Sequence, residues 1–357
     1  MKFICTKNDI LESLEIADRV VNVKNSTSIL STVLLEVDTT LKLVSSSGSL
    51  SFISDVKVDI VEKGGVAVHC NKLYSIVKKL PDSDLEFSII DYNLIIIVLN
   101  NKKIKYIIKG VDKEKFPVIN IKKNVFKSID KKYLVSALKK AVISIDIDGS
   151  RRFAKGIYID NKNIISTDGK RASIIKNAID SFIDNHIILS YELIQELLKV
   201  EFDKISLSID ENKIVFKLDN YIFIGNLIDM SLIPYEKLIP ERYEISIELK
   251  VSELKDKLNR IQTMCDSESN KVIFSFTQNM VDIRTENVVF GEGNENIVID
   301  YNNSNISISL NNKFILDVLN VVETDIIIMS IVDMTSVVSI REKDNNNYIY
   351  LMMPMVL

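Results

Sequence analysis

One pattern recurs three times along the chain at a spacing of about 120 residues. Three short segments carry apolar side chains at positions i, i+3 and i+4, the spacing of one face of an α-helix. They are Asn71–Leu80, Tyr191–Val200 and Asn312–Val321. Equivalent positions, such as Leu73, Ile194 and Ile315, are 121 residues apart. One hydrophobic core rarely grows beyond about 250–300 residues, so 357 residues repeating in this way predict three similar domains.

The surroundings of these helices repeat as well. A second amphipathic helix is expected upstream in each copy, at Asn8–Val21, Lys131–Ser144 and Val251–Cys265, preceded by short strands at Lys2–Lys7, Val125–Ile129 and Glu244–Lys250. Alternating segments such as Val56–Ile60 are typical of half-buried antiparallel strands. Each copy runs into an apolar residue followed by proline, at Phe116-Pro117, Ile233-Pro234 and Met353-Pro354. The predicted class is α+β, with helices on one face of antiparallel sheet, and the predicted domains are 1–122, 123–242 and 243–357.

Charge is distributed unevenly over the three copies. The net charge is −4, but the first two copies each carry +2 and the third carries −8. Basic side chains gather on the predicted helices: Lys72, Lys78 and Lys79 on one, and Lys131, Lys132, Lys139 and Lys140 on the polar side of another. Taken singly, these are solvated helix faces. If the helices share one surface, they form a diffuse positive field that neutralises phosphates without reading bases.

Few residues offer chemistry for catalysis. Glycine and proline together number only 15, and neither G-x-x-x-x-G-K-[ST] nor G-x-G-x-x-G occurs. The three cysteines, Cys5, Cys70 and Cys265, are far apart, as expected in a reducing cytosol, and His69 and His186 cannot build a histidine-rich metal site. No apolar run approaches the roughly 18 residues of a membrane span. We therefore expect a cytoplasmic protein with no membrane contact, no metal and no cofactor.

Three polar motifs remain as candidates. Asp146 and Asp148 beside Gly149 suit a mobile turn as well as metal binding, and His69-Cys70 lacks a third catalytic partner. Thr167-Asp168-Gly169-Lys170-Arg171 is the most concentrated motif, and a β-turn flanked by two cations explains it.

Short motifs in order along the whole chain resemble those of the bacterial DNA polymerase III β subunit, the sliding clamp. They are Met1-Lys2-Phe3, Thr27-Ser28-Ile29-Leu30, Leu80-Pro81, Phe116-Pro117, Thr167–Arg171, Leu316–Asn320 and Met353–Leu357. The resemblance implies three tandem DNA-clamp domains and a head-to-tail homodimeric ring around double-stranded DNA, with helices lining the hole and antiparallel sheets outside. It implies a non-catalytic processivity subunit. Its partners would be the DNA polymerase III catalytic subunit, a clamp loader and other proteins with a clamp-binding motif.

The resemblance also implies three sets of functional residues. A partner-peptide groove between the second and third domains would use Ala154, Thr167, Gly169, Lys170, Arg171, Ala172, Ile233, Lys237, Leu238, Val337, Met353, Pro354 and Met355. The DNA-facing residues would be Lys24, Lys72, Lys78, Asp148, Arg152 and Phe153. The ring interface would pair the strand near Tyr106 with the helix end at Thr263 and Met264. The chain departs from the family in having Lys170 where histidine is common, and Ala154 and Ala172 where larger aliphatic residues are common.

Two other functions stay open on the residues alone. A three-domain scaffold could bind partner peptides without encircling DNA. An enzyme could use Thr167–Arg171 as an anion site.

Overall fold

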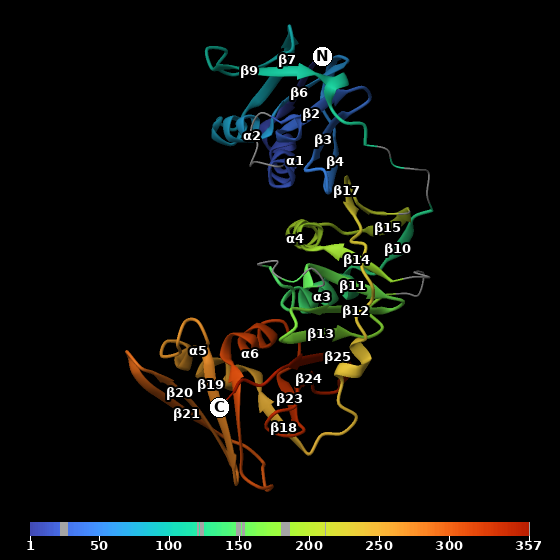
Figure 1. The fold of residues 1–357 in the computed structure, drawn as a ribbon. Coiled ribbons are helices and arrows are strands. Elements are labelled where there is room, and N and C mark those ends of the chain that lie inside the picture. Colours follow the sequence, from blue (N-terminus) through green and yellow to red (C-terminus); the bar gives the residue numbers. More distant parts are fainter. Residues whose placement is uncertain are drawn as a thin grey trace. The chain divides into compact units, whose positions relative to one another are not determined.

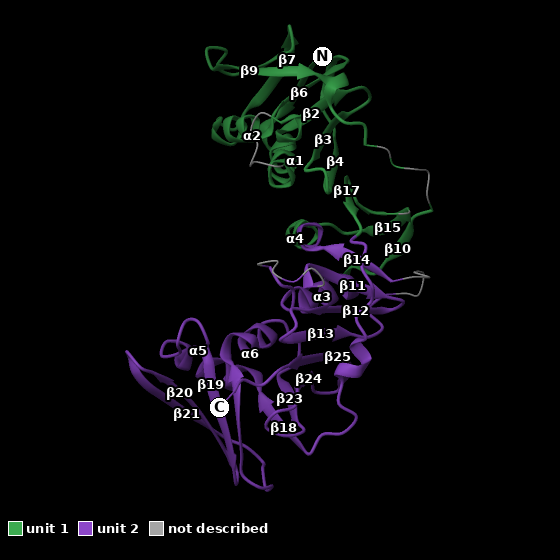
Figure 2. Ribbon diagram, in the orientation of Figure 1, with its two compact units in different colours: residues 1–131, 195–227 green, residues 132–194, 228–357 purple. Residues whose placement is uncertain are grey.

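The computed structural model describes residues 1–21, 28–119, 121, 125–147, 151, 154–179, 186–210 and 212–356. Its chain divides into two compact units (Figure 2): unit 1 comprises residues 1–131 and 195–227, and unit 2 comprises residues 132–194 and 228–357. The middle third of the sequence therefore contributes to both units.

Six α-helices lie at or within three residues of the predicted positions. They are α1 (Lys7–Val20), α2 (Cys70–Lys79), α3 (Lys131–Val142), α4 (Tyr191–Lys199), α5 (Val251–Gln262) and α6 (Asn312–Leu319). The start of α1 is set by a capping box, in which the Thr6 side chain accepts from the Asp9 backbone and the Asp9 carboxylate accepts from the Thr6 backbone. No helix in the described residues is long and apolar enough to cross a membrane.

Each copy of the repeat builds two four-stranded antiparallel sheets with one strand order. The first sheet has the orders β6-β2-β3-β4, β14-β11-β12-β13 and β22-β19-β20-β21 in the three copies. The strands are β2 (Thr32–Val37), β3 (Leu41–Ser46), β4 (Leu50–Val56), β6 (Gly64–His69), β11 (Gly156–Asp160), β12 (Asn163–Thr167), β13 (Arg171–Ile175), β14 (Ile187–Ser190), β19 (Lys271–Thr277), β20 (Met280–Asn287), β21 (Gly291–Val298) and β22 (Ile306–Asn311).

The second sheet repeats in the same manner, with the orders β1-β7-β8-β9, β10-β15-β16-β17 and β18-β23-β24-β25. A further strand, β5 (Asp59–Glu62), pairs with β1 at the edge. The bounds are β1 (Lys2–Thr6), β7 (Asp84–Ile90), β8 (Asn93–Val98), β9 (Lys105–Asp112), β10 (Lys127–Ile129), β15 (Ile205–Asp210), β16 (Lys213–Leu218), β17 (Tyr221–Asn226), β18 (Ile245–Lys250), β23 (Ile326–Ile331), β24 (Val338–Glu342) and β25 (Asn345–Met352). Figure 1 shows these strands in sequence colours.

Sheets of successive copies join edge to edge at two places, which we call the closed junctions. Inside unit 1, β4 of the first copy pairs antiparallel with β17 of the second copy, with Phe52 opposite Phe223. Inside unit 2, β13 of the second copy pairs antiparallel with β25 of the third copy, with Ser173 opposite Tyr350. The middle copy thus gives one sheet to each unit, because backbone hydrogen bonds bind each of its sheets to a different neighbour.

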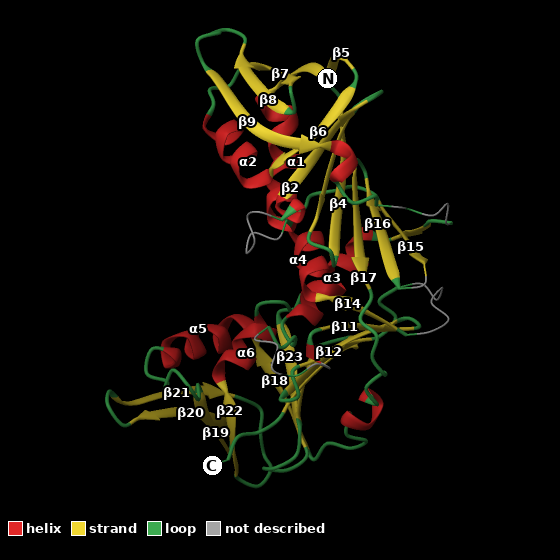
Figure 3. Ribbon diagram, turned by 45° about the horizontal axis from the view of Figure 1, so that its top comes forward, coloured by secondary structure: helices red, strands yellow, loops and turns green. Residues whose placement is uncertain are grey.

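The helices cover one side of these sheets. In unit 1, α1 packs against α2 and against β3 and β4, while in unit 2 α5 packs against α6 and lies over β21 (Figure 3). The apolar stripe of each helix faces the sheets, with Ile10, Leu14 and Ala17 of α1 and Leu254, Leu258 and Ile261 of α5 buried. The polar faces of the helices are left for solvent or for another molecule.

Candidate functional site

The turn between β12 and β13 is held rigid by its own side chains. The Asp168 carboxylate accepts backbone hydrogen bonds from Lys170 at 2.8 Å and from Arg171 at 3.0 Å. The Thr167 hydroxyl donates to the Arg171 carbonyl at 2.6 Å. Gly169 has φ of +82°, a left-handed conformation that glycine adopts without steric cost. The motif is thus a β-turn, and its carboxylate and hydroxyl are used to shape it.

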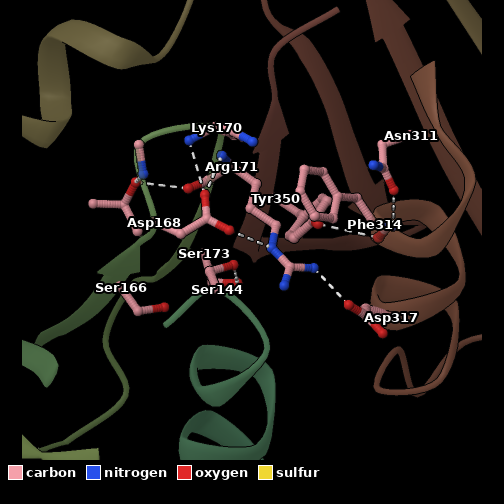
Figure 4. Close-up of polar contacts among 12 residues, drawn as sticks. Ser144, Ser166, Asp168, Lys170, Arg171, Ser173, Asn311, Phe314, Asp317 and Tyr350 are labelled. Atoms are coloured by element: carbon pink, nitrogen blue, oxygen red, sulfur yellow. Dashed lines mark hydrogen bonds and ion pairs between the residues drawn. The ribbon is translucent and has the colours of Figure 1, made fainter. Parts of the chain in front are cut away.

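Arg171 is committed to structural contacts behind this turn (Figure 4). Its guanidinium lies 3.0 Å from Asp168 and 2.6 Å from Asp317 of α6, and it stacks over the ring of Phe314. Burial acts to lower the pKa of Arg171, but the neighbouring Tyr350 and Asp317 outweigh burial and leave that pKa raised. Because the guanidinium is nearly buried and already neutralised, the turn is poorly suited to an enzymatic anion site.

A pocket of about 170 Å³ opens beside this turn within unit 2. Nine of the thirteen predicted groove residues line it: Thr167, Gly169, Lys170, Arg171, Ala172, Ile233, Leu238, Val337 and Met353. The sequence interpretation missed Leu351 and Met352, which also line it. Their strand, β25, pairs with β13, and no local signal in the sequence pointed to that pairing. We call this pocket the groove.

The other four predicted groove residues lie outside this lining. Ala154 is fully buried, and Lys237 is exposed beside Leu238. Pro354 is half-buried, and the backbone N–H of Met355 donates to the Ser309 carbonyl at 2.8 Å. Apolar side chains thus make up most of the groove lining, and the exposed Lys170 is also part of it.

Two of the predicted DNA-facing residues, Lys72 and Lys78, are exposed on α2. The Lys78 ammonium donates to the Tyr74 hydroxyl at 2.9 Å, and this hydrogen bond raises the Lys78 pKa, so the side chain stays charged at neutral pH. Lys24, Asp148, Arg152 and Phe153 lie outside the described residues.

Lys140 is not on the polar side of its helix, and that prediction is wrong. Its ammonium is buried, 2.9 Å from Glu342 and 3.1 Å from Glu323, and lies over the Tyr348 ring. The position flanks the apolar stripe of α3, and packing against the third copy covers it. Lys131, Lys132 and Lys139 of the same helix are exposed, as predicted.

Of the predicted ring-interface residues, Tyr106 and Met264 lie at sheet edges. Tyr106 is on the first half of β9, where Lys105–Lys109 pair only with β8 and leave the other side without a strand among the described residues. Thr263 is exposed at the end of α5. Met264 is half-buried beside Gly293 of β21, where an added Cβ would lie 3.4 Å from the Met264 Cβ. β21 is itself an edge strand, paired only with β20 among the described strands.

In the candidate pair His69-Cys70, the cysteine is poorly placed for reaction. Cys70 is fully buried at the start of α2, and burial raises its pKa well above the usual range, so its thiol stays protonated. Within the described ranges, no three histidine, cysteine, aspartate or glutamate residues are grouped to hold a metal ion.

Two family models match the chain, one near each end. Residues 1–120 match the N-terminal domain of the DNA polymerase III β subunit, and residues 236–356 match its C-terminal domain. The chain belongs to the DNA polymerase III β subunit family, the β sliding clamps. This is the family of replication processivity factors whose motifs the sequence resembles.

Individual members of the family are similar over most or all of the chain. The β sliding clamp of Treponema pallidum is 25% identical over 80% of both chains, and that of Synechocystis is 22% identical over the full length of both. Among solved structures, the Bacillus subtilis sliding clamp has a TM-score of 0.91 at 22% identity, covering 100% of this chain and 99% of that one. The Pseudomonas aeruginosa β subunit has a TM-score of 0.90 at 20% identity, with full coverage of both. The fold is that of a sliding clamp.

Proposed function

We propose that this sliding clamp closes as a head-to-tail homodimeric ring around duplex DNA and tethers replication and repair proteins without catalysing a reaction. Each chain would supply three clamp domains, residues 1–122, 123–242 and 243–357, so that the ring would hold six. One observation carries it. The two closed junctions use equivalent strands. At the two ends of the repeat, the equivalent strands are β21 and β9, and among the described residues one side of β21 and one side of the Lys105–Lys109 part of β9 have no paired strand.

Strand pairing inside each copy fixes which residues are equivalent. Tyr106, Phe223 and Tyr350 each lie opposite the corresponding residue of the preceding strand: Ile96, Phe216 and Ile340. Phe52, Ser173 and Gly293 correspond in the same way, since they lie opposite Ser45, Ser166 and Thr285.

This equivalence predicts the register of the third junction. At the closed junctions Phe52 faces Phe223 and Ser173 faces Tyr350. Gly293 of one protomer is therefore expected to face Tyr106 of the partner protomer. Gly293 has no side chain, and the Tyr106 ring would cover it and reach Met264. The family resemblance associates Tyr106 with Met264, and this register supplies a physical reason for the contact.

Exposure supports this interface. Tyr106 is 44% exposed and Ile107 is 61% exposed. Their equivalents at the closed junctions are buried: Phe223 and Tyr350 at 0%, Ile224 at 4% and Leu351 at 2%. Exposed apolar side chains at positions that are buried in both sister junctions indicate a surface that a partner covers.

Charge is complementary in the same register. Glu292 of one protomer would lie opposite Ile107 of the partner protomer, diagonally between that protomer's Lys105 and Lys109. Diagonal neighbours on one face of an antiparallel pair are within reach of long side chains, and opposite charges there are favourable. The acidic third copy and the basic first copy are thus suited to each other, which favours head-to-tail association.

The ring proposal gives the helices and the groove their roles. The exposed lysines of α2 and α3 would face the DNA phosphates, where weak contacts centre the duplex without stopping its sliding. The mostly apolar groove would accept the hydrophobic anchors of a partner peptide. Lys170 in its lining and the exposed Lys237, next to Leu238 in the sequence, would favour a peptide with a nearby carboxylate.

Retention on circular DNA tests encirclement. Protein loaded by a clamp loader and ATP onto a nicked circular plasmid should stay with the DNA through gel filtration, and should be lost once the plasmid is linearised, because only topology holds it. Equal retention on both forms would contradict encirclement. A monomer at every concentration, by light scattering, would favour a non-encircling scaffold.

The groove can be tested separately. Leu238 lines the groove and is 39% exposed, so Leu238→Asp places a charge where an apolar anchor would bind. We expect the affinity for a peptide carrying the clamp-binding motif to fall at least about tenfold, since burying one large apolar side chain is worth roughly 1.5–3 kcal/mol. Fluorescence anisotropy measures this. Val118→Asp, at an exposed position in unit 1, is the control, and equal affinity of both variants would remove the groove from the proposal.

A further inference from the structure

The most exposed apolar group in the described residues is the turn between β20 and β21. Val288, Val289 and Phe290 are 106%, 79% and 74% exposed, and we call them the tip. The tip borders Gly291, the first residue of β21, so it adjoins the edge that the proposed function assigns to the ring interface. Three consecutive large apolar side chains in water indicate a surface that is covered in the assembled protein.

The closed junctions show where such a turn lies. At each of them a carbonyl just before the paired strand accepts a backbone hydrogen bond from the end of the facing strand. Asn226 donates to Ser49 at 2.9 Å, and Met353 donates to Lys170 at 2.8 Å. By the same equivalence, the Lys109 N–H of one protomer should donate to the Phe290 carbonyl of the partner protomer.

The junction in unit 2 also shows what the turn faces. Gly169 and Lys170, the equivalents of Val289 and Phe290, line the groove together with Val337, the last residue of the connection between β23 and β24. The corresponding connection in the first copy is the turn between β7 and β8. Ile90 and Tyr92 at that turn are 59% and 53% exposed, and the Tyr92 carbonyl lies against Gly110 of β9.

We propose that the tip of one protomer packs against Ile90 and Tyr92 of its partner protomer. At the ring interface it fills the space that, in unit 2, is open as the groove. The small and charged residues Asp168, Gly169 and Lys170 leave that space free for a peptide. The valines and phenylalanine of the tip occupy it, so the interface gains an apolar clasp and loses a peptide site. This inference rests on the proposed ring, and it adds a contact outside the pairing of β21 with β9.

A double-mutant cycle on the full-length protein tests the clasp, with dimer dissociation constants from sedimentation equilibrium. Val289→Ser with Phe290→Ser should raise the dissociation constant at least about tenfold. Tyr92→Asn, which keeps a residue that tolerates the left-handed conformation at φ of 61°, should raise it as well. If the two surfaces touch, the combined variant should be weakened by much less than the product of the separate factors. Val118→Ser, at a position 82% exposed and outside the strands β9 and β21, should dimerise as the wild type does.

The outcomes separate the clasp from the ring. Unchanged dimerisation of the tip variant, or strictly multiplicative effects of the two changes, would overturn the clasp while leaving the ring intact. A wild type that is monomeric at every concentration would overturn both. The substituted side chains are exposed at turns, so circular dichroism should show the wild-type fold in every variant.

Discussion

Replacing Lys140 with alanine should lower the free energy of unfolding by about 3–5 kcal/mol, because the change leaves buried carboxylate charge without its partner. Glu342 is 2% exposed and lies 2.9 Å from the lysine ammonium, and Glu323 lies 3.1 Å from it. Burial acts to raise the pKa of Glu323, but hydrogen bonds from Ser136 and Lys140 outweigh burial and hold that pKa below its usual 4.5. A carboxyl group with a lowered pKa stabilises the fold above its usual pKa, and this contribution is lost as pH falls through the folded value.

Urea denaturation followed by circular dichroism measures the loss. Lys139→Ala removes an exposed charge from the neighbouring position and should change stability by less than about 0.5 kcal/mol. Lys140→Met combined with Glu342→Leu should recover most of the loss, since an apolar pair of similar volume often replaces a buried ion pair without penalty. Equal stability of Lys140→Ala and Lys139→Ala would show that the buried ion pair adds nothing.

The second large effect is expected at the ring edge. Tyr106→Asp with Ile107→Asp should make the protein a monomer, raising the dimer dissociation constant roughly a thousandfold or more. Burial of each large apolar side chain contributes roughly 1.5–3 kcal/mol, and 1.4 kcal/mol corresponds to a factor of ten. The new carboxylates would also approach Glu292 of the partner protomer. Analytical ultracentrifugation measures the association, and the variant should be lost from circular DNA as quickly as from linear DNA.

Two further variants make this test specific. Val61→Asp changes an apolar residue within β5 that is 60% exposed, and it should leave dimerisation unchanged. Lys105→Glu with Lys109→Glu should weaken the dimer, and adding Glu292→Lys should restore part of the affinity if the predicted register is right. Dimerisation of the aspartate variant at wild-type strength would contradict the pairing of β9 with β21.

The helices were predictable because their apolar spacing is local. The stripe of Leu134, Ala137 and Leu138 faces the sheets as its periodicity indicates. Local spacing also put Lys140, two residues beyond Leu138, on the polar side of its helix, and that prediction was wrong. Its burial depends on Glu342 and Glu323. No local pattern reports contacts with residues so distant in sequence.

The groove was predictable only in part. The motif Thr167–Arg171 identified a rigid turn, and the family resemblance associated it with Ile233, Leu238 and Met353. Leu351 and Met352 were missed because their part in the groove follows from the pairing of β25 with β13. The role of Arg171 also changed, since its contact with Asp317 makes it a support for the groove wall and leaves its own guanidinium already paired.

By itself, the sequence determined that the chain is one α+β unit written three times, since which side chains face water is recorded in local periodicity. It also determined the charge difference between the copies. Only the tertiary structure decided that the middle copy gives one sheet to each compact unit, and that β21 and the Lys105–Lys109 part of β9 each have a side with no paired strand among the described residues. The physical reason is that strand pairing and register come from backbone hydrogen bonds between distant segments, and those bonds depend on no particular side chain that a sequence pattern could reveal.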